Sequence, residues 1–212
     1  MIKRIIFDLD NTLIMWDDKY YDTLDKTLNL FEIKYDEIIK TNLIKAVDDY
    51  ENRYDIFKME YMKKIMEEYS NLSLPNDFVY NWTLFLENSI PDEIDNELIE
   101  ILEYLSSKYE LIVLTNWFTE EQRNRLKNYG ILKYFKEVLG TDQFKNKPNK
   151  EAFIGASRPY QMNECISIGD SLKKDVESAL EYGMDAILYD YKNEYSGNIK
   201  KVNKLIDLKK YL

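Results

Sequence analysis

The sequence predicts an α/β fold in which helices cover both faces of a doubly wound parallel sheet, with one α-helical domain inserted into the chain. Short apolar runs alternate with stretches of helical periodicity over most of the 212 residues, as in parallel α/β folds. The first apolar run ends at Leu9 and the second begins at Leu111, a gap far too long for one crossover. The chain is 45% hydrophobic and 32% charged, a balance typical of globular domains.

The core elements follow from these runs. Five strands are predicted, at Arg4–Leu9, Leu111–Thr115, Glu137–Gly140, Cys165–Gly169 and Ala186–Tyr189. Helices are predicted between them at Asn96–Lys108, Thr119–Tyr129, Lys150–Tyr160 and Lys173–Tyr182, and the tail 198–212 is expected to add a strand edge and a final helix. Gly130 and Gly183 stand where helices should end, and Thr119 with Gln122 resembles a capping box. Right-handed crossovers would then wind the sheet in both directions.

The long gap is predicted to be an inserted helical cap. The expected division is a core of residues 1–15 and 91–212 and a cap of residues 16–90, with Pro91 marking the return to the core. Four cap helices are predicted, at Lys19–Leu30, Tyr35–Glu51, Ile56–Tyr69 and Asp77–Asn88. Aromatic residues recur through them, and Tyr20, Tyr50 and Tyr54 are candidates for ligand contact. Their helical spacing favours core packing instead.

Two absences exclude whole classes of chemistry. The chain has no histidine, so a Ser-His-Asp triad, a Cys-His pair and a histidine zinc site are excluded. The single cysteine, Cys165, cannot form an internal disulfide or a cysteine metal cluster, and its apolar neighbours predict an inert, buried position. Chemistry in this chain must therefore use carboxylates, hydroxyls, lysine or arginine, backbone N–H groups and a hard metal ion.

The charge and the apolar runs also limit partners and location. The formal net charge of −10 disfavours nucleic acid and anionic lipid as partners, and an anionic ligand would need locally concentrated cations such as a divalent metal. No apolar run approaches the roughly 18 residues that a membrane helix needs. The N-terminal sequence does not resemble a signal peptide. A cytoplasmic protein is the expectation.

Two carboxylates follow the first predicted strand. Because side chains alternate along a strand, Asp8 and Asp10 are expected to point the same way, at the sheet edge where parallel folds bind ligands. Two close acids repel unless a cation lies between them, and oxygen ligands in a small site suit Mg²⁺. Alone, the pair fits a turn with two solvated acids equally well.

Polar groups also follow the second and third predicted strands. Thr115 and Asn116 stand where a phosphoryl oxygen would accept their hydrogen bonds, although a strand end with a helix cap explains them as well. Lys147 precedes Pro148, which suits a helix start, so a fixed lysine could balance the acids. Lys145 is a rival for that role, and a solvated surface lysine is the alternative for both.

The fourth predicted strand ends in Gly169, Asp170 and Ser171, with Asp175 five residues after Asp170. Asp170 would complete the metal ligands, and Asp175 would support the metal site or Lys147 from behind. A helix cap followed by a surface acid is the alternative. Four strand ends that each deliver a group needed for metal-assisted phosphoryl transfer nevertheless favour a shared site.

The order of these groups resembles the four motifs of the haloacid dehalogenase superfamily. The matching residues are Asp8-x-Asp10-x-Thr12, Thr115-Asn116, Lys147-Pro148 and Gly169-Asp170-Ser171 with Asp175. The resemblance covers the whole chain, the helical insertion included, and implies a Rossmann-like core with a helical cap. The first and fourth motifs are specific, and the other two carry little weight without them.

The resemblance implies a role for each residue. Asp8 would be the nucleophile that becomes an aspartyl-phosphate, and Asp10 the general acid/base whose backbone carbonyl also binds Mg²⁺. Asp8 and Asp170 would supply the other metal ligands, with Asp175 and Ser171 supporting them. Thr115, Asn116 and Lys147 would bind the phosphoryl oxygens, with Thr115 and Lys147 contributing to catalysis as charge develops.

Asp10 discriminates within the superfamily, because dehalogenase members lack an aspartate there. Its presence favours a magnesium-dependent phosphatase acting on a small phosphorylated metabolite, such as a nucleotide or a sugar phosphate. A sugar-phosphate mutase and a catalytically inactive binding protein remain alternatives, and the oligomeric state stays open.

The stretch from Leu114 to Glu120 resembles the 5′-nucleotidase-like branch of the superfamily. That branch often has a glycine after the Thr-Asn pair, where this chain has Trp117. Trp117 is a candidate for substrate contact, stacking on a base or sugar, with packing beneath the cap as the alternative.

Overall fold

The core of the protein is a six-stranded parallel sheet. The computed structural model describes residues 1–15 and 19–212, without the side chains of residues 19 and 20. The strand order is β3-β2-β1-β4-β5-β6, and every neighbouring pair is parallel. The strands are β1 (Arg4–Phe7), β2 (Glu110–Leu114), β3 (Glu137–Leu139), β4 (Cys165–Gly169), β5 (Asp185–Tyr189) and β6 (Lys201–Val202). The chain winds outward from β1 in both directions, which confirms the predicted doubly wound α/β fold.

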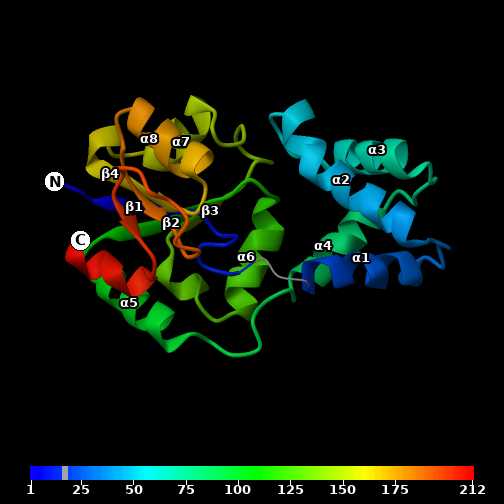
Figure 1. The fold of residues 1–212 in the computed structure, drawn as a ribbon, viewed down its shortest axis with the longest axis horizontal. Coiled ribbons are helices and arrows are strands. Elements are labelled where there is room, and N and C mark those ends of the chain that lie inside the picture. Colours follow the sequence, from blue (N-terminus) through cyan, green and yellow to red (C-terminus); the bar gives the residue numbers. More distant parts are fainter. Residues whose placement is uncertain (16–18) are drawn as a thin grey trace.

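Helices cover both faces of this sheet (Figure 1). On one face, α5 (Asn96–Ser106), α6 (Thr119–Asn128) and a final 3₁₀ helix (Leu205–Lys210) pack on a cluster that includes Phe7, Val113 and Ile168. On the other face, α7 (Lys150–Ser157) and α8 (Ser178–Glu181) pack on Ile6, Ile112 and Cys165. Alternate residues of the same strands thus fill two cores, because successive side chains point to opposite faces.

Four further helices lie together beyond one edge of the sheet layer and are called the cap helices below (Figure 1). They are α1 (Lys19–Leu30), α2 (Glu37–Arg53), α3 (Met59–Ser70) and α4 (Phe78–Leu86). Their apolar faces form a separate cluster around Tyr50, Met66 and Trp82. The predicted boundary near Trp16 lies outside the described residues, and the division at 16–90 stays a prediction.

Some local predictions are confirmed and others differ from the structure. Gly130 and Gly183 end helices in the left-handed region as expected, with φ of 80° and 84°. The predicted helix at Lys173–Tyr182 is a π-helical segment, Leu172–Glu177, followed by α8. The helix predicted at Lys150–Tyr160 begins at Lys150 as expected and ends earlier, at Ser157, and Pro148 lies two residues before its start.

The predicted capping box at the start of α6 is also wrong. The helix is preceded by Phe118, and the Thr119 hydroxyl bonds to Asp142 at 2.6 Å. The Gln122 side chain turns inward instead of capping the helix. Among the described residues, no helix combines the length and apolar character that crossing a bilayer requires.

Candidate active site

The predicted site residues meet at one edge of the sheet. Asp8 directly follows β1, Thr115 follows β2 and Asp170 follows β4. Lys147 lies in the loop that leads from β3 to α7. Because the strands are parallel, their carboxyl ends share this edge. The sheet therefore brings together groups that are far apart in the sequence.

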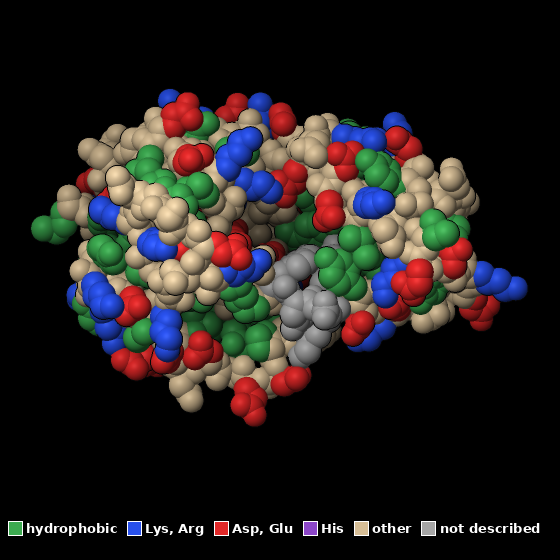
Figure 2. All heavy atoms as spheres, viewed as in Figure 1, with side chains coloured by type: hydrophobic (Ala, Val, Ile, Leu, Met, Phe, Trp, Pro, Cys, Tyr) green, Lys and Arg blue, Asp and Glu red, His purple; other side chains and the backbone are tan. Residues whose placement is uncertain are grey.

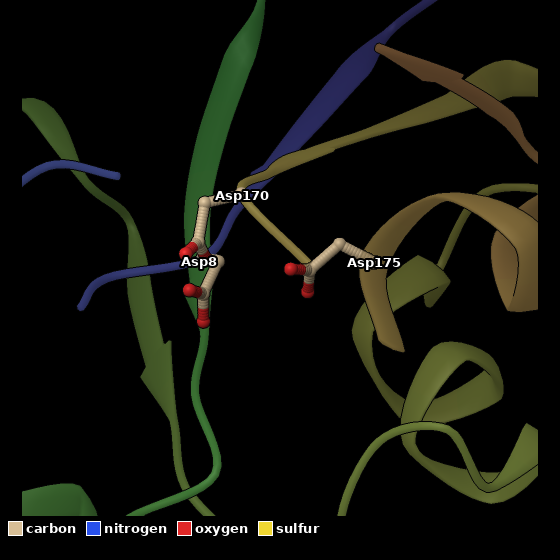
Figure 3. A group of neighbouring side chains, drawn as sticks. All are labelled: Asp8, Asp170 and Asp175. Atoms are coloured by element: carbon tan, nitrogen blue, oxygen red, sulfur yellow. The ribbon is translucent and has the colours of Figure 1, made fainter. Parts of the chain in front are cut away.

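Three carboxylates and one lysine form the centre of the site. One oxygen from each of Asp8, Asp170 and Asp175 lies within 4.8 Å of the others. Figure 3 shows Asp8 beside Asp170, with Asp175 pointing toward them from the following helix. The buried Lys147 Nζ donates to Asp8 Oδ1 at 2.7 Å and to Asp175 Oδ1 at 2.5 Å. The lysine thus ties the first and fourth motifs together.

Asp175 has both of its oxygens occupied. Oδ1 accepts from Lys147, and Oδ2 accepts from the backbone N–H of Ser171 at 3.0 Å. Gly169 makes room for this carboxylate, because a Cβ there would lie 2.3 Å from Asp175 Oδ2. Asp175 therefore orients Lys147, which leaves Asp8 and Asp170 as the carboxylates available to a cation.

Burial makes the negative charge of this cluster costly. It raises the pKa of Asp8 well above its ordinary value, and the nearby Lys147 offsets this only in part. Burial, and next the Asp175 carboxylate, raise the pKa of Asp170 to about 6. Burial lowers the pKa of Lys147, but Asp175 and Asp8 outweigh it and the net shift is upward. A further cation beside Asp8 and Asp170 would relieve the repulsion, and a site with only oxygen donors fits a hard ion such as Mg²⁺.

Asp10 faces a different set of partners. Arg125 Nη1 donates to its Oδ1 at 2.5 Å, and Gln122 Nε2 donates to its Oδ2 at 2.7 Å. Both partners belong to α6. Both Asp10 oxygens thus have donors from α6, and the cation expected between the Asp8 and Asp10 carboxylates stays a prediction.

The α6 side chains connect Asp10 to other parts of the chain. Gln122 also donates to the Thr115 hydroxyl at 3.1 Å. Arg125 donates to the Ser89 carbonyl, where the chain returns from the cap helices, at 3.1 and 3.3 Å. The neighbouring Glu121 is buried, 3.8 Å from the Arg125 guanidinium, and burial raises the pKa of its carboxyl well above the usual range. Glu121, Arg125 and this role of Gln122 were not predicted, because their only signal in the sequence is their spacing on one predicted helix.

Asn116 holds the lysine loop in place. Its side chain accepts from the Lys147 N–H at 2.7 Å and donates to the Lys147 carbonyl at 2.9 Å. It also donates to Glu51 of α2 at 3.0 Å, a contact with the cap helices that nothing in the sequence predicted. Lys145, the rival lysine, lies 3.5 Å from Glu151 and makes no ion pair with Asp8 among the described residues.

Trp117 packs among the cap helices. Its side chain is 6% exposed, and its ring centroid lies 5.3 Å from Phe57 and 5.6 Å from Trp82. Trp117 also borders the cavity described below. Tyr50 is fully buried and Tyr54 stacks on Tyr61, so core packing explains both, while the Tyr20 side chain lies outside the described residues.

A cavity of about 640 Å³ opens between the sheet edge and the cap helices. Figure 2 shows the hollow between these two parts of the molecule. Asp8, Lys147 and Asp170 line it from the core, and Asp48 and Glu51 line it from the cap side. The reactive groups thus face a space large enough for a small metabolite.

The family model for haloacid dehalogenase-like hydrolases matches residues 5–189. The chain belongs to the haloacid dehalogenase-like hydrolase family. The match runs from β1 to the end of β5 and includes the cap helices and all four motifs. The family resemblance predicted from the motifs is therefore confirmed.

Relatives that match most or all of the chain include proteins named as phosphatases. The glyceraldehyde 3-phosphate phosphatase of Methanocaldococcus jannaschii is 27% identical over 100% of this chain and 99% of its own length. The human N-acylneuraminate-9-phosphatase is 22% identical over 91% of this chain and 84% of its own. Among solved structures, the HAD-hydrolase YfnB of Bacillus subtilis shares the fold with a TM-score of 0.78, at 18% identity over 99% of this chain and 98% of that one.

Proposed function

We propose that this hydrolase is a magnesium-dependent phosphatase that releases phosphate from a small phosphomonoester through an aspartyl-phosphate on Asp8. The contact of Lys147 with both Asp8 and Asp175, beside the Asp170 carboxylate, carries the proposal. The phosphatases among the relatives support the reaction class. The YfnB structure, which is described as bound to magnesium, supports the choice of ion.

Asp8 and Asp170 would hold Mg²⁺, together with the backbone carbonyl of Asp10. The ion would neutralise charge on the phosphoryl oxygens. Lys147, kept in place by Asp175 and Asn116, would lie against the same oxygens. The Thr115 hydroxyl and the Asn116 N–H would bind the remaining phosphoryl oxygen. Positioning and charge stabilisation would thus carry most of the catalysis.

The reaction would proceed in two transfers. An Asp8 carboxylate oxygen attacks phosphorus, the bond from phosphorus to the leaving oxygen breaks, and that oxygen takes a proton from Asp10. A water molecule then attacks phosphorus, gives its proton to Asp10, and the bond from phosphorus to Asp8 breaks. Asp10 must carry this proton at the start of the first transfer, and each of its oxygens, which accepts one hydrogen bond from Arg125 or Gln122 here, has a second lone pair that can hold it.

The test is hydrolysis of an aryl phosphate by the purified protein with Mg²⁺. We expect Asp8→Asn to lose at least about a thousandfold in kcat, since the nucleophile is removed. Asp207→Asn, a matched change on the C-terminal 3₁₀ helix, should keep the activity. Activity of the natural sequence no higher than that of Asp8→Asn would overturn the proposal. Isomerisation of a sugar phosphate without phosphate release would favour the mutase alternative. A cytoplasmic location and the lack of a nucleic-acid partner stay predictions.

A further inference from the structure

The core and the cap helices line the cavity with different charged groups, because the core contributes lysines beside its aspartates whereas the cap side contributes only acids. Its basic lining residues, Lys147, Lys173 and Lys174, all come from the core. The cap side contributes Val47, Asp48, Glu51, Asn52, Asp55 and Phe57, which are acidic, amide or apolar. No lysine or arginine of the described cap residues lines the cavity.

The helix α2 presents these acids as one stripe. Asp48, Glu51 and Asn52 are three and four residues apart, so they share a face of the helix, and Asp55 follows just past its end. Glu51 Oε2 accepts from Lys174 at 2.5 Å and from Asn116 at 3.0 Å, so the charge of Glu51 and that of Lys174 offset each other.

The other two acids are exposed and are paired less closely than Glu51. Asp55 lies 4.0 Å from Lys145, at the limit of an ion pair, and is largely exposed. Asp48 is exposed and has no ion pair among the described residues. Among the described residues, the cap side thus offers carboxylate and amide oxygens to the cavity and supplies no cation of its own for a second anion.

The position of the reacting groups decides which end each part of a substrate meets. If Asp8 attacks phosphorus, as the proposed function has it, the phosphoryl group lies at the core end beside Lys147. The rest of the ester then extends toward Asp48 and Asn52. An ammonium or hydroxyl group there would donate to the carboxylates, whereas a carboxylate or second phosphate would meet like charge.

We infer that the natural substrate is a phosphomonoester whose distal part carries hydroxyl or ammonium groups and no second anionic group. Asp48 is the residue that excludes the anion. The inference rests on the proposed function and narrows its substrate class.

Three two-carbon phosphomonoesters test the inference, because they differ only in their distal group. They are O-phosphoethanolamine with an ammonium, 2-hydroxyethyl phosphate with a hydroxyl, and phosphoglycolate with a carboxylate. We expect kcat/KM for phosphoglycolate to be at least tenfold below that for either of the others. Equal or better hydrolysis of phosphoglycolate would overturn the inference.

Asp48→Lys should shrink this discrimination at least fivefold by raising kcat/KM for phosphoglycolate. Glu60→Lys is the matched control, because Glu60 is an exposed acid of α3 that does not line the cavity. It changes the net charge equally and should leave the order of the three esters unchanged. An equal effect of both variants would show that overall charge, not the cavity wall, sets the preference, and would overturn the assignment to Asp48.

Two measurements keep this result separate from the proposed function. Aryl phosphate hydrolysis that is lost in Asp8→Asn tests the phosphatase itself and does not depend on the order of the three esters. Affinities of the three esters for Asp8→Asn with Mg²⁺, measured by calorimetry, test the charge preference without turnover. Phosphoglycolate binding as tightly as O-phosphoethanolamine would overturn the inference even in an active phosphatase.

Discussion

Removing the Arg125 guanidinium tests most directly whether the contacts of this buried side chain stabilise the fold. It is 1% exposed, donates to Asp10, to Gln122 and to the Ser89 carbonyl, and so joins the site to the segment that returns from the cap helices. Arg125→Met keeps the aliphatic stem and removes every donor. The variant therefore measures the hydrogen bonds and the charge rather than the packing volume.

The expected loss follows from the partners left behind. The Asp10 side chain is 24% exposed, so water would solvate part of its charge, and the lost ion pair should cost about 1.5 kcal/mol. The Ser89 carbonyl belongs to a buried residue and would lose both of its arginine donors, which should cost about 1.5 kcal/mol more. We expect a loss of about 3 kcal/mol in the free energy of unfolding, or a fall of about 6–12 °C in Tm.

Urea denaturation followed by circular dichroism measures this loss. Arg123→Met is the matched control, because Arg123 is an exposed arginine of the same helix, and its effect should stay within about 0.5 kcal/mol. Arg125→Met combined with Asp10→Asn should cost less than the two single changes together, by about 1 kcal/mol or more. A loss below about 1 kcal/mol for Arg125→Met, or strict additivity, would refute this account of the α6 contacts.

Three further predictions concern buried charges near the site. Gly169→Ala should displace the Asp175 carboxylate, because the new Cβ would lie 2.3 Å from its Oδ2. We expect phosphatase kcat to fall at least about tenfold and the free energy of unfolding to fall by about 1–3 kcal/mol. Burial raises the pKa of Asp170 to about 6 from an ordinary 3.8, so the folded state retains a proton that the unfolded chain has released. The free energy of unfolding that this proton contributes is lost as pH rises through about 6. In the proposed site Mg²⁺ would replace that proton, so the rise in Tm that Mg²⁺ causes should be larger at about pH 7.5 than at about pH 5, and an equal rise would contradict this. Glu121→Gln should stabilise the protein increasingly as pH rises, because burial raises the pKa of Glu121 and its charged form is costly. Urea midpoints of both proteins measured across pH test this, and a difference that does not change with pH would contradict it.

The sheet could be predicted from the sequence because its strands are buried on both faces. Such strands are nearly continuous apolar runs, and each predicted run overlaps an observed strand, with Cys165–Gly169 matching at both ends. The short edge strand β6 lay in the predicted tail without fixed bounds, because two residues carry little periodicity. The segment after β4 was predicted as an ordinary helix. Apolar spacing does not distinguish the π-helical turn that carries Asp175 from an α-helical one.

The central cluster of the site was predictable for a related reason. Parallel strands deliver their carboxyl ends to one edge, so Asp8, Asp170 and Lys147 converge whatever the details of the helices. The orientation of Asp10 was not predictable, because it depends on donors from α6 that occupy one helix face only in the folded chain. Gln122 had been interpreted as a helix cap. Local capping and long-range hydrogen bonding compete for the same side chain, and the partly buried Asp10 carboxylate binds it here.

Trp117 shows why a motif can place a residue at the site without defining its role. The backbone of the loop after β2 belongs to the core, yet its indole packs with Phe57 and Trp82 in the cluster formed by the cap helices. The adjacent Asn116 holds the Lys147 backbone and also contacts Glu51 of α2. A single dipeptide thus connects the cap helices to the lysine that faces Asp8. Packing of the cap side against this loop therefore bears directly on the geometry at Asp8, the proposed nucleophile, while the nearly buried indole has little surface left for a ligand.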